Sequence, residues 1–286
     1  MDLWIVLFLL AVGLIPSFLM TWVGVGWVLH YADRLGLVDR PGERKIHAVP
    51  IGTLAVLLLN AFEGSWLLPA SVAVHLDGFQ SRIGEIWGIV GCGTTLVLLG
   101  LADDRHGLPW WLRLVIEFLI AGICVYFFGV QLTAFIKLPW LTGILSVLWI
   151  VTLINSFNML DNMDGLSGGV AAIAAIVLTL MVLSGPNPEV GSQIFIALLM
   201  LVIVGSLFGF LCYNRPPARI FMGDAGSYLV GFWMAIGTLL ATYTGTAGQR
   251  SHSVIAPLVI LAIPLYDTAS VVLIRLWEGR SPFDGD

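Results

Sequence analysis

Apolar runs of near membrane-spanning length follow one another along the whole chain. Nine can be counted, at about residues 3–30, 51–74, 86–101, 112–130, 138–156, 166–183, 194–213, 226–244 and 254–276. Runs of this length and character are typical of transmembrane helices. With 58% hydrophobic and 11% charged residues, the composition excludes an ordinary soluble domain. The sequence therefore predicts an all-α, polytopic integral membrane bundle of about nine transmembrane helices, forming one domain over residues 1–286.

The positive charges between these runs predict the orientation of the bundle. If the runs cross alternately, one side collects ten cations: Arg34, Arg40, Arg44, Lys45, Arg105, Arg113, Arg215, Arg219, Arg275 and Arg280. The other side keeps Arg82, Lys137 and Arg250. By the positive-inside rule, the richer side is cytoplasmic and the N-terminus lies outside. Every polar cluster of the chain then lies on the cytoplasmic side.

One of these clusters, residues 155–169 (NSFNMLDNMDGLSGG), lies between two apolar runs. Asn158, Asp161 and Asp164 recur at every third position, so a helical turn through this stretch would place them near one face. Carboxylates and amides at the end of a membrane helix are costly unless water, a cation or a ligand satisfies them. Helix capping is the simpler interpretation, but a cap needs one such residue and not three.

Acids and bases in the cytoplasmic clusters, taken together, extend this pattern. The acids are Asp103, Asp104, Asp161, Asp164 and Asp224, and the bases include Arg44, Lys45, His47, Arg215 and Arg219. Oxygen ligands without His or Cys clusters favour a hard cation, and Mg²⁺ held jointly by carboxylates and substrate phosphates fits best. The basic residues suit phosphate groups. Together with the apolar body, these features indicate phosphoryl-type transfer onto a lipid.

Simpler interpretations stay open for single residues. Asp103 and Asp104 could form a solvated turn before Pro109, and Asp224 could cap a helix beginning near Gly226. The Arg44–Lys45 pair could be positive-inside charges alone. Glu117, inside an apolar run, is expected to face the bundle interior in a structural role. A secondary transporter with ion-coupling acids is the rival class, but it predicts inverted repeats and acids at midplane depth.

Several segments resemble the signatures of the polyprenyl-phosphate N-acetylhexosamine-1-phosphate transferase superfamily, glycosyltransferase family 4. They are residues 103–108 (DDRHGL), 155–169 and 219–227 (RIFMGDAGS), with a further likeness at 39–41 (DRP) and 44–47 (RKIH). The resemblance covers about residues 39–276 in the family's order. It implies a Mg²⁺-dependent enzyme, with Mn²⁺ as an alternative ion, that transfers a sugar 1-phosphate from a UDP-sugar to a polyprenyl phosphate and releases UMP.

The residues within these motifs resemble most the type that transfers N-acetylglucosamine (GlcNAc) 1-phosphate to undecaprenyl phosphate. Such an enzyme initiates a lipid-linked cell-envelope glycan, such as lipopolysaccharide or teichoic acid, in the bacterial cytoplasmic membrane. The rival within the superfamily is the phospho-N-acetylmuramoyl-pentapeptide transferase of peptidoglycan synthesis. The expected partners are the UDP-sugar, the lipid phosphate and the membrane, with a homodimer as one assembly and no nucleic acid.

The resemblance also implies roles for individual residues. Asp103 and Asp104 match the catalytic pair, and Asp161 matches a site acid acting in metal binding or proton transfer. Asn158 and Asp224 match metal-binding positions. Substrate-binding positions are matched by Lys45, His47, Asp164, Asn214 and Phe221, of which Asp164 and Phe221 belong to the uracil pocket.

Two departures from the family's pattern stand out. The segment after His47, residues 48–53 (AVPIGT), is shorter than the family's Pro-containing, double-Gly segment. The family's His-rich motif after the last matched helix would begin where residues 281–286 (SPFDGD) stand. We therefore expect a chain truncated at its C-terminus, whose activity in this form needs a direct test.

Overall fold

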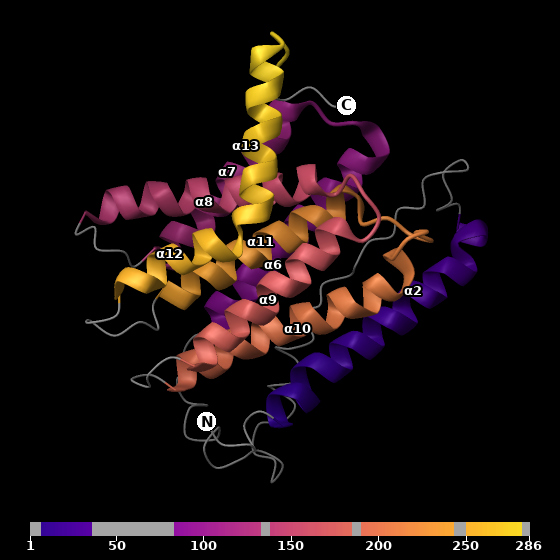
Figure 1. Ribbon diagram of the computed structural model, residues 1–286, viewed down its shortest axis with the longest axis horizontal. Helices are drawn as coiled ribbons and strands as arrows, with labels where there is room; N and C mark the ends of the chain where they lie inside the picture. The colour runs from indigo at the N-terminus through magenta and orange to yellow at the C-terminus, as the bar shows by residue number, and fades with distance from the viewer. Residues whose placement is uncertain (1–6, 36–82, 133–137, 185–189, 243–249, 282–286) are drawn as a thin grey trace.

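The computed structural model describes residues 7–35, 83–132, 138–184, 190–242 and 250–281. All regular elements in these ranges are helical (Figure 1). They are η1 (Leu10–Leu14), α2 (Ile15–Leu35), α6 (Ile83–His106), α7 (Trp110–Tyr126), α8 (Pro139–Leu160), α9 (Leu166–Ser184), α10 (Val190–Asn214), α11 (Gly223–Ala241), α12 (Arg250–Ile260) and α13 (Ala262–Trp277). The prediction of an all-α chain is confirmed.

Six helical segments in the described part of the chain are long and apolar enough to cross a membrane. They cover Leu7–Tyr31, Gly84–His106, Pro139–Leu160, Leu166–Ser184, Gln193–Asn214 and Gly223–Ala241. Each corresponds to one of the nine apolar runs, and the run expected to be short forms the 24-residue α6. These helices confirm a multi-pass membrane protein. The run at 51–74 lies outside the described residues.

The remaining two expected spans have a different form from the long helices. α7 has 17 residues, with exposed Trp110 and Trp111 at its start and exposed Tyr126 and Phe127 at its end. Aromatic residues at both ends are typical of a helix that reaches from one membrane interface to the other. The span expected at 254–276 is wrong as a single helix, because it is divided into α12 and α13 at Leu261, whose backbone leaves the helical region (φ −102°, ψ 20°). α13 then runs across the direction of α12 (Figure 1).

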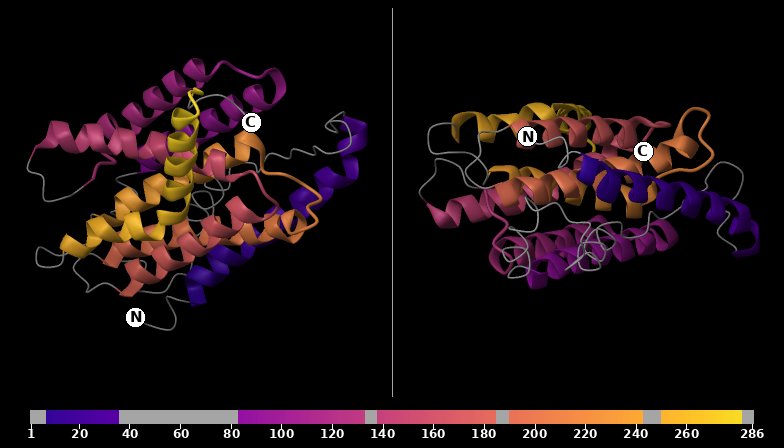
Figure 2. Two further views of the ribbon diagram at one scale, coloured as in Figure 1. Left: turned by 45° about the horizontal axis from the view of Figure 1, so that its top comes forward. Right: turned by 90° about the horizontal axis from the view of Figure 1, so that it is seen from below.

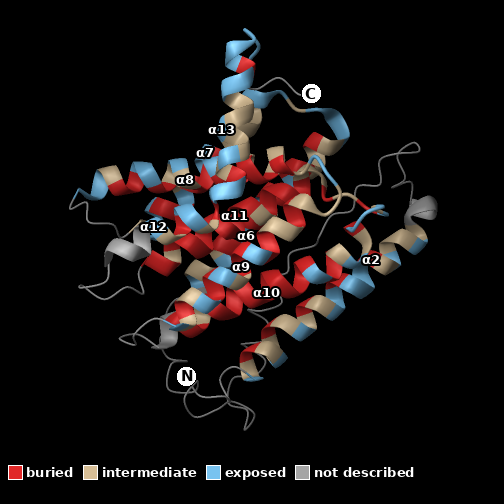
Figure 3. Cartoon of the chain, viewed as in Figure 1, coloured by how far each residue is buried: buried red, intermediate tan, exposed pale blue. Residues whose placement is uncertain are grey.

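α11 is the central helix of the bundle. It packs against α8 and α6, while α10 packs against α2 and α9, and nearly every side chain of α11 is buried (Figure 3). In the view from below, α6 and α7 lie on one face and α12 and α13 on the opposite face, with α10 and α11 between them (Figure 2). The core is mainly apolar, and many large apolar side chains on the outer helices are exposed, as expected where lipid replaces water.

The helix order brings the polar clusters of the sequence together. α6, α8 and α10 end near the points where α9 and α11 begin, because the loop after α8 is hydrogen bonded to the loop between α10 and α11. Asp104 at the end of α6 also contacts the first turn of α11. One end of the bundle therefore carries all the described candidate site residues.

The alternating topology predicts that the two ends of α9 lie on opposite sides of the membrane. Its 19 residues rise about 28 Å at 1.5 Å per residue. In a chain with the exposed Cys212 replaced by serine, we expect Asn162→Cys to react with an impermeant thiol reagent from the cytoplasmic side and Ser184→Cys from the other. Both residues are exposed. Labelling of both from one side would contradict the topology.

Candidate functional site

Asp104 and Asp224 meet where α6 ends and α11 begins. The Asp224 backbone N–H donates to Asp104 Oδ1 at 3.1 Å. The first N–H groups of a helix have no partner within the helix and carry a partial positive charge, so a carboxylate is favoured there. Gly223 permits the approach, because a Cβ at Gly223 would lie 2.9 Å from Asp104 Oδ2. Two acids separated by 120 positions in the sequence thus share one site.

Asn158, in the last turn of α8, joins this pair. Its Nδ2 donates to Asp224 Oδ1 at 2.8 Å and to Ser227 Oγ at 3.1 Å. The two residues assigned to the metal from the sequence are therefore adjacent. In this geometry the amide N–H group of Asn158 orients the Asp224 carboxylate.

Asp161 completes the acidic group from the end of α8. The pKa of its carboxyl is raised to about 7, mainly by burial and also by the negative charges of Asp224 and Asp104, while a backbone hydrogen bond from Gly223 acts in the opposite direction. A cation among these carboxylates would favour their charged forms. The electrostatics of the site therefore suit a bound cation.

The donor set fits Mg²⁺ in chemistry. Mg²⁺ is usually bound through one or two carboxylates together with substrate phosphates and water, and Asp224 and Asp104 offer two carboxylates. Among the described residues, no three His, Cys, Asp or Glu side chains form a complete protein ligand set. The residues that would hold the ion are thus Asp224 and Asp104, with Asn158 and Asp161 beside them.

Close packing of α6 on α11 sets this arrangement. A Cβ added at Gly100 would overlap the backbone of Ala225, so only glycine allows the two helices to approach this closely. Gly100 lies one helical turn before Asp104, and Ala225 follows Asp224 directly. The role of Gly100 could not be predicted from the sequence, because it depends on the neighbouring helix.

Asp103 has different surroundings from Asp104. It is buried and accepts three hydrogen bonds, from Arg113 Nη1 at 2.6 Å, Tyr228 Oη at 3.0 Å and the Leu108 backbone N–H at 2.8 Å. The interpretation of both acids as a solvated turn is wrong, since both lie in the last turns of α6. Arg113 and Tyr228 were also missed, although Tyr228 follows Asp224 by four residues and so lies near it on the same helix.

Asp164 and Asn214 connect the two loops beside the acidic group. Asp164 Oδ2 accepts from the Ala218 backbone N–H at 2.9 Å. Asn214 is buried, accepts from the Gly165 backbone N–H at 2.9 Å and donates to the Ile220 carbonyl at 2.7 Å. Asn214 therefore supports the loops, and its side chain is enclosed between them.

The regular helical turn considered for the Asn/Asp-rich stretch is not formed. α8 ends at Leu160, and Gly165 has a φ of +71°, a conformation that favours glycine and ends helices. Asn158 therefore contacts α11, whereas Asp164 contacts the loop before it. The three residues serve two adjacent parts of the site instead of sharing one helical face.

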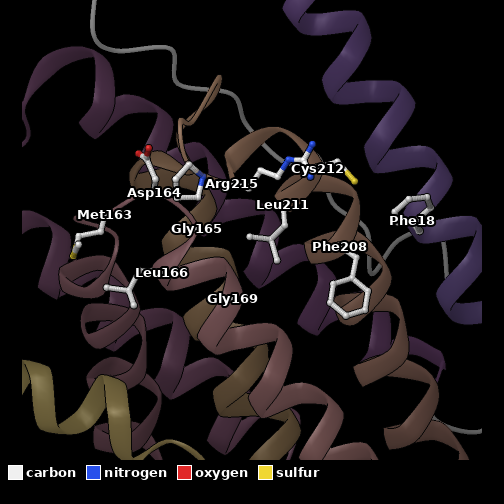
Figure 4. Close-up of a pocket in the computed structure, with 11 residues that line it drawn as sticks. Phe18, Met163, Asp164, Gly165, Leu166, Gly169, Phe208, Leu211, Cys212 and Arg215 are labelled. Carbon is white, nitrogen blue, oxygen red and sulfur yellow. The ribbon is translucent and has the colours of Figure 1, made fainter.

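An open cleft of about 750 Å³ lies next to these loops, lined by α2, α9 and α10. Asp164 and Arg215 lie at one end of it, and Phe18, Phe208 and Leu211 supply its apolar wall (Figure 4). Of the two residues assigned to the uracil pocket, Asp164 lines this cleft and the partly buried Phe221 does not. Lys45 and His47 lie outside the described residues.

The comparison with known proteins agrees with this arrangement. Residues 86–242 match the family model of glycosyl transferase family 4, a range that includes the acids of α6, the loop after α8 and the start of α11. The chain is 30% identical over 284 residues to a probable undecaprenyl-phosphate N-acetylglucosaminyl 1-phosphate transferase of Bacillus subtilis, covering 93% of this chain and 72% of that protein.

Two further relatives extend the comparison. A decaprenyl-phosphate N-acetylglucosaminephosphotransferase of Mycolicibacterium smegmatis is 29% identical, over 96% of this chain and 72% of its own length. A phospho-N-acetylmuramoyl-pentapeptide-transferase of Levilactobacillus brevis is 40% identical, but over only 29% of this chain and 22% of its own. Since the family model spans more than half of the chain and the matches over 93–96% of the chain agree with it, this protein belongs to glycosyl transferase family 4.

Proposed function

We propose that this protein transfers GlcNAc 1-phosphate from UDP-GlcNAc to undecaprenyl phosphate and releases UMP. The observation that carries the proposal is the acidic group made by Asp104, Asp161 and Asp224 at one end of a membrane bundle. Asp104 and Asp224 of this group can hold a divalent cation jointly with a diphosphate, and the open cleft beside the loops has an apolar wall suited to a lipid chain. The likeness over 93–96% of this chain to polyprenyl-phosphate GlcNAc-1-phosphate transferases supports the same substrates.

The reaction requires one displacement at phosphorus. An oxygen of the lipid phosphate attacks the β-phosphorus of the UDP-sugar, the bond from that phosphorus to the bridging oxygen breaks, and UMP leaves with that oxygen. A Mg²⁺ ion held by Asp224 and Asp104 would supply positive charge to offset the negative charge that develops on the departing UMP phosphate. The second ionisation of a phosphomonoester has a pKa of about 6, so at neutral pH most of the lipid phosphate is the dianion, which can attack directly.

The residues of this chain bind and orient the reactants in the proposed reaction. Asp224 and Asp104 would hold the cation that binds the diphosphate, and Asn158 orients the Asp224 carboxylate. One carboxylate of the pair Asp103 and Asp104 takes or orients the remaining proton of the lipid phosphate. In this type of transfer, positioning and charge neutralisation supply most of the catalysis.

The nucleotide is assigned to the neighbouring loops. Asp164, in the loop after α8, and Phe221, just before α11, are proposed to bind the uracil, Asp164 by hydrogen bonding and Phe221 by stacking. Lys45 and His47 are proposed to face the diphosphate. Even without Arg275 and Arg280, which lie at the end of the divided segment and after it, the alternating runs predict eight cations on this side against three on the other. We therefore place this end of the bundle in the cytoplasm of a bacterium, where nucleotide sugars are available.

The extent of similarity favours GlcNAc 1-phosphate over the muramoyl-pentapeptide substrate. The likeness to GlcNAc-1-phosphate transferases runs through 93–96% of the chain, whereas the local match to the muramoyl type covers 29%. A sugar pocket is assembled from several loops, so a likeness over the whole chain is the better guide to it.

A radiolabel-transfer assay tests the proposal. Purified full chain in lipid is supplied with undecaprenyl phosphate and, in separate reactions, with UDP-GlcNAc, UDP-N-acetylgalactosamine and UDP-N-acetylmuramoyl-pentapeptide. We expect labelled lipid and UMP from UDP-GlcNAc, in a reaction that requires Mg²⁺ and yields no UMP without the lipid. Transfer from the muramoyl substrate alone, or release of UMP without acceptor, would contradict it.

A further inference from the structure

Glu117 is a buried acid to which the proposed reaction gives no role. It lies in the middle of α7 and faces the bundle interior with no exposed surface, as its place in an apolar run predicts. Its Oε2 accepts a hydrogen bond from Asn155 Nδ2 of α8 at 2.5 Å, while Oε1 has no hydrogen-bond partner among the described residues. Burying an incompletely bonded carboxyl group is costly, so we expect this acid to serve a purpose that an apolar residue would not.

Asn155 is the first residue of the polar stretch at the end of α8, and its amide is bonded in two directions. Nδ2 donates to Glu117 and also to the Val151 carbonyl of the preceding turn at 2.9 Å. Both N–H groups of the amide are thereby used, one within α8 and one across to α7. Asn155 therefore ties the end of α8 to α7.

The tie restrains how α8 is rotated about its own axis. A Cβ added at Gly231 of α11 would overlap the backbone of Leu153 and Ile154, so α8 and α11 touch directly before Asn155. Glycine presents no side chain to interlock with α8, whereas a hydrogen bond is directional. The close contact with α11 sets how near the helices lie, and the bond to Glu117 sets which way α8 faces.

The rotation of α8 decides where Asn158 points. Asn158 follows Asn155 by three residues, so the two side chains are neighbours on the helix surface. Asn158 Nδ2 reaches Asp224 Oδ1 at 2.8 Å and Ser227 Oγ at 3.1 Å. At the ~5 Å radius of helix side chains, a rotation of about 12° moves a side chain by roughly 1 Å. A shift of this size is enough to take Asn158 out of hydrogen-bonding range of Asp224.

We infer that Glu117 is a positioning residue, which acts through Asn155 to hold the last turns of α8 in the rotation at which Asn158 orients Asp224. The effect on transfer rests on the proposed function, whereas the effect on α8 does not. Glu117 contacts no reactant. It adds α7 to the helices that hold the acidic group in place.

Removing the acceptor tests the inference. Glu117→Leu keeps the interior apolar and leaves Asn155 without its partner on α7. We expect the transfer rate to fall at least ~10-fold, the lower end of the effect of changing groups that orient metal ligands, and the Mg²⁺ concentration for half-maximal rate to rise. Glu117→Gln keeps an acceptor oxygen for Asn155 and is expected to stay within a few fold of the wild type in both measurements.

Exchanging the two residue types restores the bond in reverse. Asn155→Asp places two carboxyl groups against each other, with no amide to donate between them, and is expected to lose activity as Glu117→Leu does. The double variant Glu117→Gln/Asn155→Asp again pairs one amide with one carboxylate. We expect it to recover at least ~10-fold, within the range of coupling between residues in contact. A folded double variant as inactive as Asn155→Asp would overturn the inference.

Thr238→Val is the matched control. Trp149 Nε1 of α8 donates to Thr238 Oγ1 at 3.0 Å, so this change also removes one side-chain hydrogen bond between α8 and a neighbouring helix. Thr238 lies 14 residues after Asp224, roughly 21 Å along α11 at 1.5 Å per residue. We expect a lower unfolding midpoint, with the transfer rate and Mg²⁺ dependence of the wild type. A loss of transfer as large as in Glu117→Leu would show that any weakening of α8 has this effect, and would overturn the inference.

Hydrogen exchange tests the geometry without any activity, because local opening depends on the contacts that hold a segment. Deuterium uptake by peptides covering residues 152–160 is expected to increase in Glu117→Leu and to stay at the wild-type level in Glu117→Gln and Thr238→Val. Unchanged uptake in Glu117→Leu would overturn the inference. A wild-type chain that transfers no sugar phosphate but shows this exchange pattern would count against the proposed function alone.

Discussion

Replacing Asp224 with asparagine is expected to lower the rate of sugar-phosphate transfer by at least ~10–100-fold, the usual cost of changing residues around a metal. The change keeps the shape of the side chain and removes its negative charge. Asp224 lies where Asn158 and Asp104 converge, so the lost charge is the one best placed to hold a cation against the diphosphate. We expect the Mg²⁺ concentration for half-maximal rate to rise as well.

Folding provides the control for this result. The site lies at the end of the bundle and Asp224 is only partly buried, so the thermal unfolding midpoint of the Asp224→Asn protein should stay close to that of the wild type. Asn158→Ala is expected to act in the same direction, since it removes the donor that orients the Asp224 carboxylate. Unchanged activity with unchanged Mg²⁺ dependence would remove both residues from the site.

Replacing Gly100 with alanine is expected to lower transfer by roughly 10²-fold without touching any acid. The new methyl group would overlap the backbone of Ala225, so α6 must move away from the start of α11. A misplacement on the order of 1 Å costs about this much in rate. Overpacking of this kind also costs about 1–3 kcal/mol of stability, which would appear as a lower unfolding midpoint.

Gly91 offers a matched control on the same helix. A Cβ at Gly91 would meet nothing within 4 Å, and alanine is the better helix former. Gly91→Ala should therefore leave both the transfer rate and the unfolding midpoint at least as high as in the wild type. If Gly100→Ala behaved like Gly91→Ala, close packing of α6 on α11 would not be what positions Asp104.

Much of the fold could be predicted because membrane helices follow local rules. An apolar run near 20 residues long must satisfy its own backbone hydrogen bonds, so it forms a helix whatever its neighbours are. The polar stretches between the runs must lie at helix ends, because acids within the bilayer are costly. This reasoning was enough to place Asp104, Asn158, Asp161 and Asp224 at one end of a bundle. The family motifs matched the same positions.

The break between α12 and α13 follows partly from a local rule and partly from packing. Residues 254–276 are mainly apolar but contain Pro264, three positions after Leu261. Proline has no N–H to donate and its ring clashes with the carbonyl four residues before it, here that of Ile260. α13 packs against α8, while α12 contacts α9, so the two halves follow different neighbours. Pro264 marks the break in the sequence, whereas the neighbours of each half could be seen only in the tertiary structure.

The sequence by itself determined which residues could take part in the site and at which end of the bundle they lie. The tertiary structure alone decided what each of them faces. Asp103 and Asp104 are adjacent and identical in type, yet Asp103 is paired with Arg113 and Tyr228 and Asp104 contacts Asp224. The reason is geometric: neighbouring side chains on a helix point in different directions. Their partners depend on how α6 packs against α7 and α11, a contact set by Gly100 and Ala225 across distant parts of the chain.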